Sequence, residues 1–148
     1  MPAELATTAS FAALKAFDLG EQKRFNGDAA GAVASYKLAV DLDPQFAIAY
    51  GRLGTVYYNT AQFALSAQAF QRAFELRVTR TSDRERLYII TLYYRFATGQ
   101  IKQTIEDYEL WRTLYPRDVA PIHNLAAQYL SIGQPQRALD LARQAFQL

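Results

Sequence analysis

The residues that decide the fold run Leu53-Gly54 … Ala61-Gln62 … Ser66 … Phe70 … Ala73. The same pattern stands 34 residues earlier, from Leu19-Gly20 through Gly27-Asp28 to Asp43-Pro44. Two later stretches carry it again, Gly99-Gln100 … Tyr115-Pro116 and Leu125-Ala126 … Ala145. A fixed period of this length indicates stacked helix–turn–helix units, each of which buries its apolar face against its neighbours.

Small residues and aromatic rings stand at fixed places in each copy. Gly20 and Gly54 are expected to let the first helix of a pair approach the second, where Tyr36 and Phe70 fill the space between them. Glycine at the fifteenth position suits the left-handed turn that ends the first helix. The pattern therefore predicts close antiparallel helix pairs joined by short turns.

The placement of glycine, proline and capping residues predicts eight helices. Ser10 and Asp118 are expected N-caps, Ser82 with Glu85 has the form of a capping box, and Pro135 suits the first turn of its helix. The expected helices cover residues 10–25, 29–43, 46–60, 63–78, 83–97, 101–115, 118–131 and 135–147. The four pairs are expected to form one domain over residues 1–148, with repeats at about 13–46, 47–80, 85–118 and 119–148.

The third repeat departs from the period. Counting back from Gly99 places the bulky Leu92 at the close helix contact, whereas a shift by one residue places Thr91 there and leaves one extra residue in the turn. The second register restores a small residue, so it is preferred. Trp111 also replaces the usual alanine, which predicts a splayed or shifted repeat.

Composition excludes several classes of function. The 148 residues contain no cysteine and one histidine, which excludes disulfides, thiolate metal sites and multi-histidine metal centres. A net charge of +2 gives no electrostatic argument for nucleic acid as a partner. Neither a signal peptide nor a long apolar segment is present, so we expect a water-soluble polypeptide without membrane insertion, a bound cofactor or a metal. The compartment stays open: the cytoplasm, or the soluble part of a membrane-tethered protein.

Over residues 13–148 the chain resembles the tetratricopeptide repeat family. This resemblance implies an all-α, right-handed superhelical solenoid of four helix–turn–helix pairs. More narrowly, the stretches 14–20, 46–58, 82–89 and 108–118 resemble the repeat region attached to bacterial eukaryotic-like serine/threonine kinases, and similar arrays occur beside winged-helix regulators. No glycine-rich loop, His-Arg-Asp or Asp-Phe-Gly motif is present, so the resemblance implies a non-catalytic part of a longer protein.

The resemblance also assigns residues to a concave peptide groove. Inner positions of the first helix of each pair carry Phe17, Asp18, Glu21 and Ile89, and the groove candidates among these positions are Arg52, Thr55, Tyr58, Asn59, Tyr88, Leu92, His123 and Asn124. Arg52 and Tyr58 are expected to face solvent. The family's lysine–asparagine clamp for a chaperone carboxylate is missing, because Phe17 and Glu21 stand where the first lysine and asparagine would be.

Three further features of the sequence have both a functional and an ordinary structural interpretation. His123 could contact a peptide or be simply solvated, and Glu106, Asp107 and Glu109 are expected to form a solvated helix face. An arginine-rich stretch between Arg72 and Arg95 could bind anions, but helix-end charges and ion pairs are the preferred interpretation.

The repeat pattern and the resemblance favour two hypotheses about function. An enzyme is a third and weaker hypothesis, because no nucleophile–base pair is found. The leading hypothesis is an interaction scaffold that binds a protein or peptide in the groove. The alternative is self-association as a weak, two-fold homodimer. Its candidate residues are Leu139, Phe146 and Leu148, which a fifth repeat or capping helix would otherwise cover.

Overall fold

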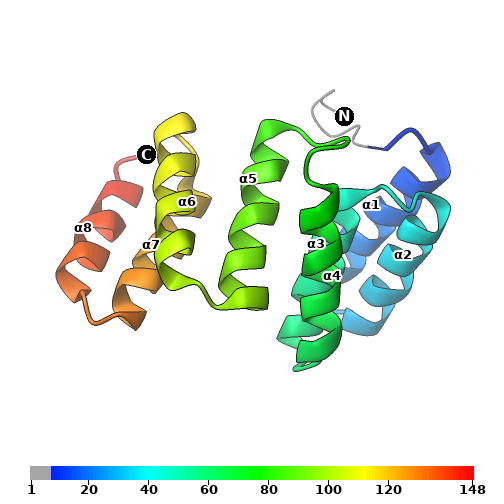
Figure 1. Cartoon of the computed structure of the whole chain (residues 1–148), viewed down its shortest axis with the longest axis horizontal. Helices are drawn as coiled ribbons and strands as arrows, with labels where there is room; N and C mark the ends of the chain where they lie inside the picture. The colour runs from blue at the N-terminus through cyan, green and yellow to red at the C-terminus, as the bar shows by residue number, and fades with distance from the viewer. Residues whose placement is uncertain (1–7) are drawn as a thin grey trace. The chain divides into compact units, whose positions relative to one another are not determined.

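A computed structural model describes residues 8–148, and within this range all regular secondary structure is helical, without a β-strand. The all-α fold expected from the sequence is therefore confirmed (Figure 1). Every helix begins and ends within two residues of its expected bounds, except the fifth. The helices are α1 (Phe11–Phe25), α2 (Ala29–Leu42), α3 (Ala47–Asn59), α4 (Phe63–Leu76), α5 (Asp83–Leu92), the π-helix η2 (Tyr93–Thr98), α6 (Ile101–Leu114), α7 (Val119–Ser131) and α8 (Pro135–Ala145).

The helix ends form where the sequence signals stand. The Ser10 side chain accepts a hydrogen bond from the Ala13 amide, and Asp118 caps α7 in the same way through Ala120. Ser82 and Glu85 make the expected reciprocal capping box at the start of α5. Gly27, Gly99 and Gly133 adopt φ angles of 77°, 66° and 75°, the left-handed conformation that closes the first helix in three of the four pairs.

Two helix pairs, α1 with α2 and α3 with α4, are built on the predicted close approaches. A Cβ atom at Gly20 would lie 2.6 Å from the Tyr36 ring, and one at Gly54 would lie 2.6 Å from the Phe70 ring. Both rings are buried. The aromatic residues therefore occupy the space that glycine leaves, and any larger residue would force the pair apart.

The fifth helix contains a feature that the sequence did not specify. Its last turn and a half, Tyr93–Thr98, is a π-helix directly continuing α5. A π-helical segment accommodates one additional residue within a helix. The extra residue expected in the turn before Gly99 is thus taken up inside the helix, and both Thr91 and Leu92 are buried.

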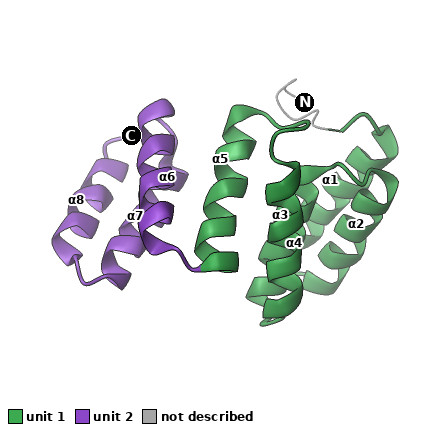
Figure 2. Ribbon diagram, viewed as in Figure 1, with its two compact units in different colours: residues 1–98 green, residues 99–148 purple. Residues whose placement is uncertain are grey.

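By its internal contacts the chain divides into two compact units, one ending at Thr98 and the other covering Gly99–Leu148 (Figure 2). In the first unit, α3 packs against α2 and η2 packs against α4. In the second, α7 packs against both α6 and α8. Trp111 of α6 is buried there, where it lies near Tyr108 and donates a 3.1 Å hydrogen bond from Nε1 to Asp118.

No helix among the described residues combines the length and the apolar character that crossing a bilayer requires.

Candidate functional site

Three residues assigned to the groove meet in the first unit, each from a different helix. Glu21 of α1 forms an ion pair with Arg52 of α3, with Oε1 and Nε 3.0 Å apart. The Nη1 of Arg52 donates a 2.7 Å hydrogen bond to the hydroxyl of Tyr88 on α5. The inner positions of three successive first helices thus form one continuous polar surface, which we call the Arg52 cluster (Glu21, Arg52 and Tyr88).

The carboxylate of Glu21 is the most heavily used group in the Arg52 cluster. It accepts a short hydrogen bond from the Tyr36 hydroxyl and one of 3.2 Å from Arg24. Burial alone would raise the pKa of Glu21, but the charge of Arg52 and the hydrogen bonds from Tyr36 and Arg24 lower it below its ordinary value. Conversely, burial and the Glu21 carboxylate raise the pKa of Tyr36. Glu21 therefore stays ionised and holds Arg52 in place.

The expectation that Arg52 faces solvent freely is wrong. Its side chain retains 26% of its full exposure and lies over the Tyr88 ring, with its Cζ atom 4.9 Å from the ring centre. Replacing Arg52 with alanine would leave the Glu21 carboxylate half-buried without its main partner. Arg52 thus combines a structural role with its place on the inner surface.

Two other groove assignments also need correction. Leu92 and Ile89 are buried, and both lie close to the position a Cβ atom would take at Gly51. They fill the contact between α5 and α3 and are not available to a peptide.

The exposed part of the inner surface lies at the carboxyl end of α3. Asn59 is exposed, Thr55 is half-buried and hydrogen-bonded to the Gly51 carbonyl, and Tyr58 is 38% exposed. The Tyr58 ring lies 4.3 Å from Phe96 of η2 and 5.4 Å from Phe63 of α4, centre to centre. Sequence reasoning missed both neighbours of Tyr58, and the placement of Phe96 depends on the π-helix.

His123 and Asn124 belong to the second unit. His123 is exposed on α7, whereas Asn124 is half-buried and donates a 3.0 Å hydrogen bond to the Ala120 carbonyl. Across residues 8–148 no group of three or more histidine and acidic side chains is placed to hold a metal ion.

The acidic residues of α6 are only partly a solvated face. Glu106 is exposed, but Glu109 accepts hydrogen bonds from Arg112 and from the Tyr129 hydroxyl. Asp107 is half-buried, and burial followed by the nearby charge of Glu106 raises its pKa despite a hydrogen bond from Gln103.

Several arginines of the arginine-rich stretch already have partners. Arg72 pairs with Glu75, Arg80 with Asp43 and Arg86 with Asp83, while Arg77 donates to the Phe74 carbonyl. These contacts agree with the interpretation of this stretch as helix-end charges.

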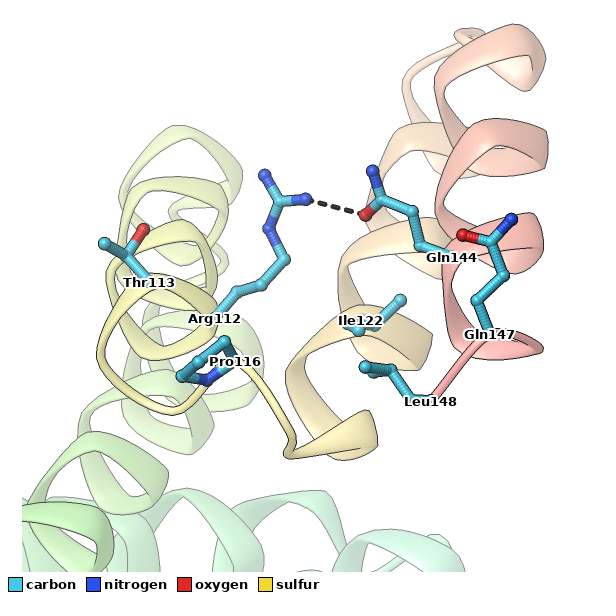
Figure 3. Close-up of a pocket in the computed structure, with 7 residues that line it drawn as sticks. All are labelled: Arg112, Thr113, Pro116, Ile122, Gln144, Gln147 and Leu148. Atoms are coloured by element: carbon cyan, nitrogen blue, oxygen red, sulfur yellow. Dashed lines mark hydrogen bonds between the residues drawn. The ribbon is translucent and has the colours of Figure 1, made fainter.

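A shallow pocket of about 450 Å³ lies in the second unit, beside a bridge between α6 and α8 (Figure 3). Arg112 of α6 donates a 2.9 Å hydrogen bond to the Gln144 side chain of α8, and Glu109 neutralises the same arginine. Ile122 and Leu148 provide apolar walls. Because its one charged side chain is already paired, the pocket offers little chemistry for a small ligand.

The three self-association candidates are exposed. Leu139, Phe146 and Leu148 retain 45%, 94% and 60% of their full exposure, while Ala138 and Leu141 of the same helix are buried against the rest of the second unit.

Comparison with known proteins assigns the fold. Residues 47–77, which cover α3 and α4, match the tetratricopeptide repeat family. No curated protein matches the chain at a significant level. The matched segment contains the close approach of Gly54 to Phe70, so the family pattern and the packing agree there.

Three solved structures illustrate the likeness over the rest of the chain. A crystal structure of MamA has a TM-score of 0.60 and 24% identity, covering 91% of this chain and 77% of that one. The APC/C hetero-tetramer Cut9-Hcn1 has a TM-score of 0.72 and 19% identity, covering 91% of this chain and 27% of that one. A kinesin light chain with nearly identical TPR-like repeats from Podosopora anserina has a TM-score of 0.58 and 19% identity, covering 95% and 75%. The chain thus has an all-α helical repeat fold of the tetratricopeptide type.

Proposed function

We propose that this protein is a non-catalytic interaction scaffold that binds a peptide or helix of a protein partner on the inner face of α1, α3 and α5. The observation that carries the proposal is the convergence of Glu21, Arg52 and Tyr88 from three successive helices. A continuous surface of partly exposed polar and aromatic groups across several repeats is what extended recognition of a peptide requires.

The chemistry of this face favours a peptide with an aromatic or aliphatic anchor. Tyr58, half-covered by Phe96 and Phe63, is a rigid aromatic platform of the kind that dominates binding energy in protein interfaces. The neighbouring Asn59 has both donor and acceptor atoms for a peptide backbone. Because Arg52 is already held by Glu21 and Tyr88, little side-chain entropy is lost when a ligand reaches it.

A random peptide library displayed on phage and panned against the immobilised chain tests the proposal. Enriched peptides should bind the parent and lose at least tenfold in affinity to the double variant Tyr58→Ala/Asn59→Ala. The matched control is Lys37→Ala/Leu38→Ala, two exposed neighbours on the outer helix α2. Equal binding to the parent and the inner-face variant, or equal loss with the control, would contradict the proposal.

A second candidate function is self-association through α8. The observation that favours it is the 94% exposure of Phe146, a large apolar side chain beside the exposed Leu148. Large apolar side chains that are exposed beside one another mark an interaction surface.

The context we propose is regulatory. The resemblance to the repeat regions of bacterial serine/threonine kinases supports a role as the partner-recognising part of a kinase or regulator. In this role the four helix pairs would act together as one array over residues 1–148. The full reading frame of the gene tests this context, since a kinase or DNA-binding domain should be fused to the array.

A further inference from the structure

Three aromatic rings from three different elements meet on the surface of the first unit. Tyr58 of α3 contacts Phe63 of α4 and Phe96 of η2, and all three elements lie within the first unit. Phe63 retains 59% of its full exposure and Tyr58 38%, whereas Phe96 is half-buried. We call these three residues the aromatic platform.

The aromatic platform rests on the core of the second helix pair. Phe96 stacks on the buried ring of Phe70, with the two centroids 5.7 Å apart and the planes inclined by 20°. The guanidinium carbon of Arg95 lies 4.6 Å from the centre of the Phe96 ring. Because Phe96 is held by these contacts, a ligand meets a surface that is already formed, and less entropy is lost on binding.

The polar groups beside the platform are hydrogen-bonding groups without a carboxylate among them. Within residues 8–148, no hydrogen bond involves the Tyr58 hydroxyl or the side-chain amide of the neighbouring Asn59. The stretches that supply the platform contain no aspartate or glutamate over residues 44–74 and 86–105. The surface therefore suits a ligand that presents hydrogen-bond acceptors and carries few donors of its own.

We propose that the aromatic platform binds a proline-rich segment of the partner in the polyproline II conformation. This inference rests on the proposed function and names the chemical class of its ligand. Proline-rich segments dock their rings on aromatic side chains. Their backbone makes no internal hydrogen bonds, so its carbonyls can accept from the Tyr58 hydroxyl and the Asn59 amide. Proline also lacks an N–H group, so such a segment does not need a carboxylate acceptor on the protein.

Two other ligand classes fit the platform less well. An amphipathic helix satisfies its backbone groups internally and would leave Tyr58 and Asn59 without backbone partners. An acidic peptide requires basic side chains beside the rings, and the guanidinium of Arg95 already lies over Phe96. A polyproline II segment is also ordered before it binds, which favours binding to a shallow surface.

Isothermal titration calorimetry with decaproline, acetylated and amidated at its ends, tests the ligand class. The parent should bind this peptide, and Tyr58→Ala and Phe63→Ala should each weaken binding by about tenfold or more. Tyr58→Phe keeps the ring and loses only the hydroxyl, so it should weaken binding less than Tyr58→Ala does. Because the peptide carries no charge, its affinity should change little between low and high salt.

Controls separate the platform from nonspecific stacking on exposed rings. Phe146→Ala removes an exposed ring from the second unit and should bind decaproline like the parent. A glycine–serine peptide of equal length should not bind. Far-ultraviolet circular dichroism should show the same helix content in every variant.

The outcomes distinguish the ligand class from the scaffold function. The proline assignment is overturned, and the scaffold function retained, if decaproline does not bind while a proline-free peptide from the phage library loses affinity in Tyr58→Ala. An acidic library peptide with that behaviour and a steep salt dependence has the same meaning. Decaproline binding that is unchanged in both Tyr58→Ala and Phe63→Ala overturns the platform as the site. Failure of decaproline and of every library peptide to bind overturns both proposals.

Discussion

Gly54 faces the ring of Phe70 so closely that a Cβ atom at Gly54 would lie 2.6 Å from Cδ1 of that ring. The ring is 1% exposed and has no space into which it could withdraw. The two residues therefore set the separation of α3 and α4, the pair that matches the tetratricopeptide repeat.

Replacing Gly54 with leucine should lower the free energy of unfolding by about 1–3 kcal/mol, the usual cost of overpacking a core. Urea denaturation of variant and parent measures this change. The matched control is Gly51→Ala on the same helix, where a Cβ atom would meet Leu92 at an ordinary 3.7 Å. That control should be neutral or stabilising by up to about 1 kcal/mol, since glycine weakens a helix. An unchanged midpoint for Gly54→Leu would mean that α3 and α4 do not meet at this residue.

Ala61 offers a stabilising substitution. It occupies the turn position held by Gly27, Gly99 and Gly133 in the other copies, and it adopts a φ of 59°. The left-handed conformation costs a residue with a Cβ atom about 1–2 kcal/mol. Glycine removes this cost but loses about 0.5–1 kcal/mol through greater freedom in the unfolded chain.

Ala61→Gly should therefore raise the free energy of unfolding by about 0.5–1 kcal/mol, measured by urea denaturation. Ala64→Gly, at an exposed site inside α4, should lower it by up to about 1 kcal/mol. Destabilisation by both changes would show that the turn at Ala61 is not left-handed in solution.

Glu21 should make the fold sensitive to acid. Because the pKa of Glu21 is lower in the folded chain than in the unfolded one, its stabilisation is complete above the unfolded value and is lost as pH falls through the folded value. Stability of the parent should therefore decline between about pH 5 and 3 more steeply than that of Glu21→Gln. Thermal melts across this range test the difference, with Asp18→Asn, exposed on the same helix, as control. Parallel curves for parent and Glu21→Gln would contradict the ion pair with Arg52.

Asp107 should behave in the opposite sense. Burial and Glu106 raise its pKa in the folded chain, so ionisation of Asp107 works against folding at neutral pH and this penalty disappears in acid. Asp107→Asn keeps an oxygen that accepts from Gln103 and should raise the melting temperature at pH 7, with the advantage shrinking as pH falls. Glu106→Gln, which removes the neighbouring charge alone, should give a smaller gain. A lower melting temperature for Asp107→Asn at pH 7 would rule out this explanation.

The helices and their ends were predictable because their causes are local. The caps at Ser10, Ser82 and Asp118 each depend on hydrogen bonds to groups within three residues. Glycine at the turns is required by a single local property, a positive φ angle. The close approaches at Gly20 and Gly54 followed from the repeat period, which places each glycine opposite a ring.

The site was predictable only in part, because the missing information is not local. The repeat frame placed Glu21, Arg52 and Tyr88 on the inner face, but their direct contacts depend on side-chain length and on the stacking of three helices. Leu92 was misassigned because its burial depends on how closely α5 packs against α3 at Gly51, which the repeat frame does not give. The π-helix at Tyr93–Thr98, which takes up the extra residue of this repeat, was not foreseen either.

A partner peptide is proposed to bind on the inner face of α1, α3 and α5. A ¹H–¹⁵N NMR titration of the labelled chain with the highest-affinity peptide from the phage library tests this binding directly. Amide shifts should concentrate on the inner residues Glu21, Arg52, Thr55, Asn59 and Tyr88, while the outer helices α2 and α4 change little. Shifts concentrated on α2 and α4, or confined to α7 and α8 with the inner face unchanged, would contradict it.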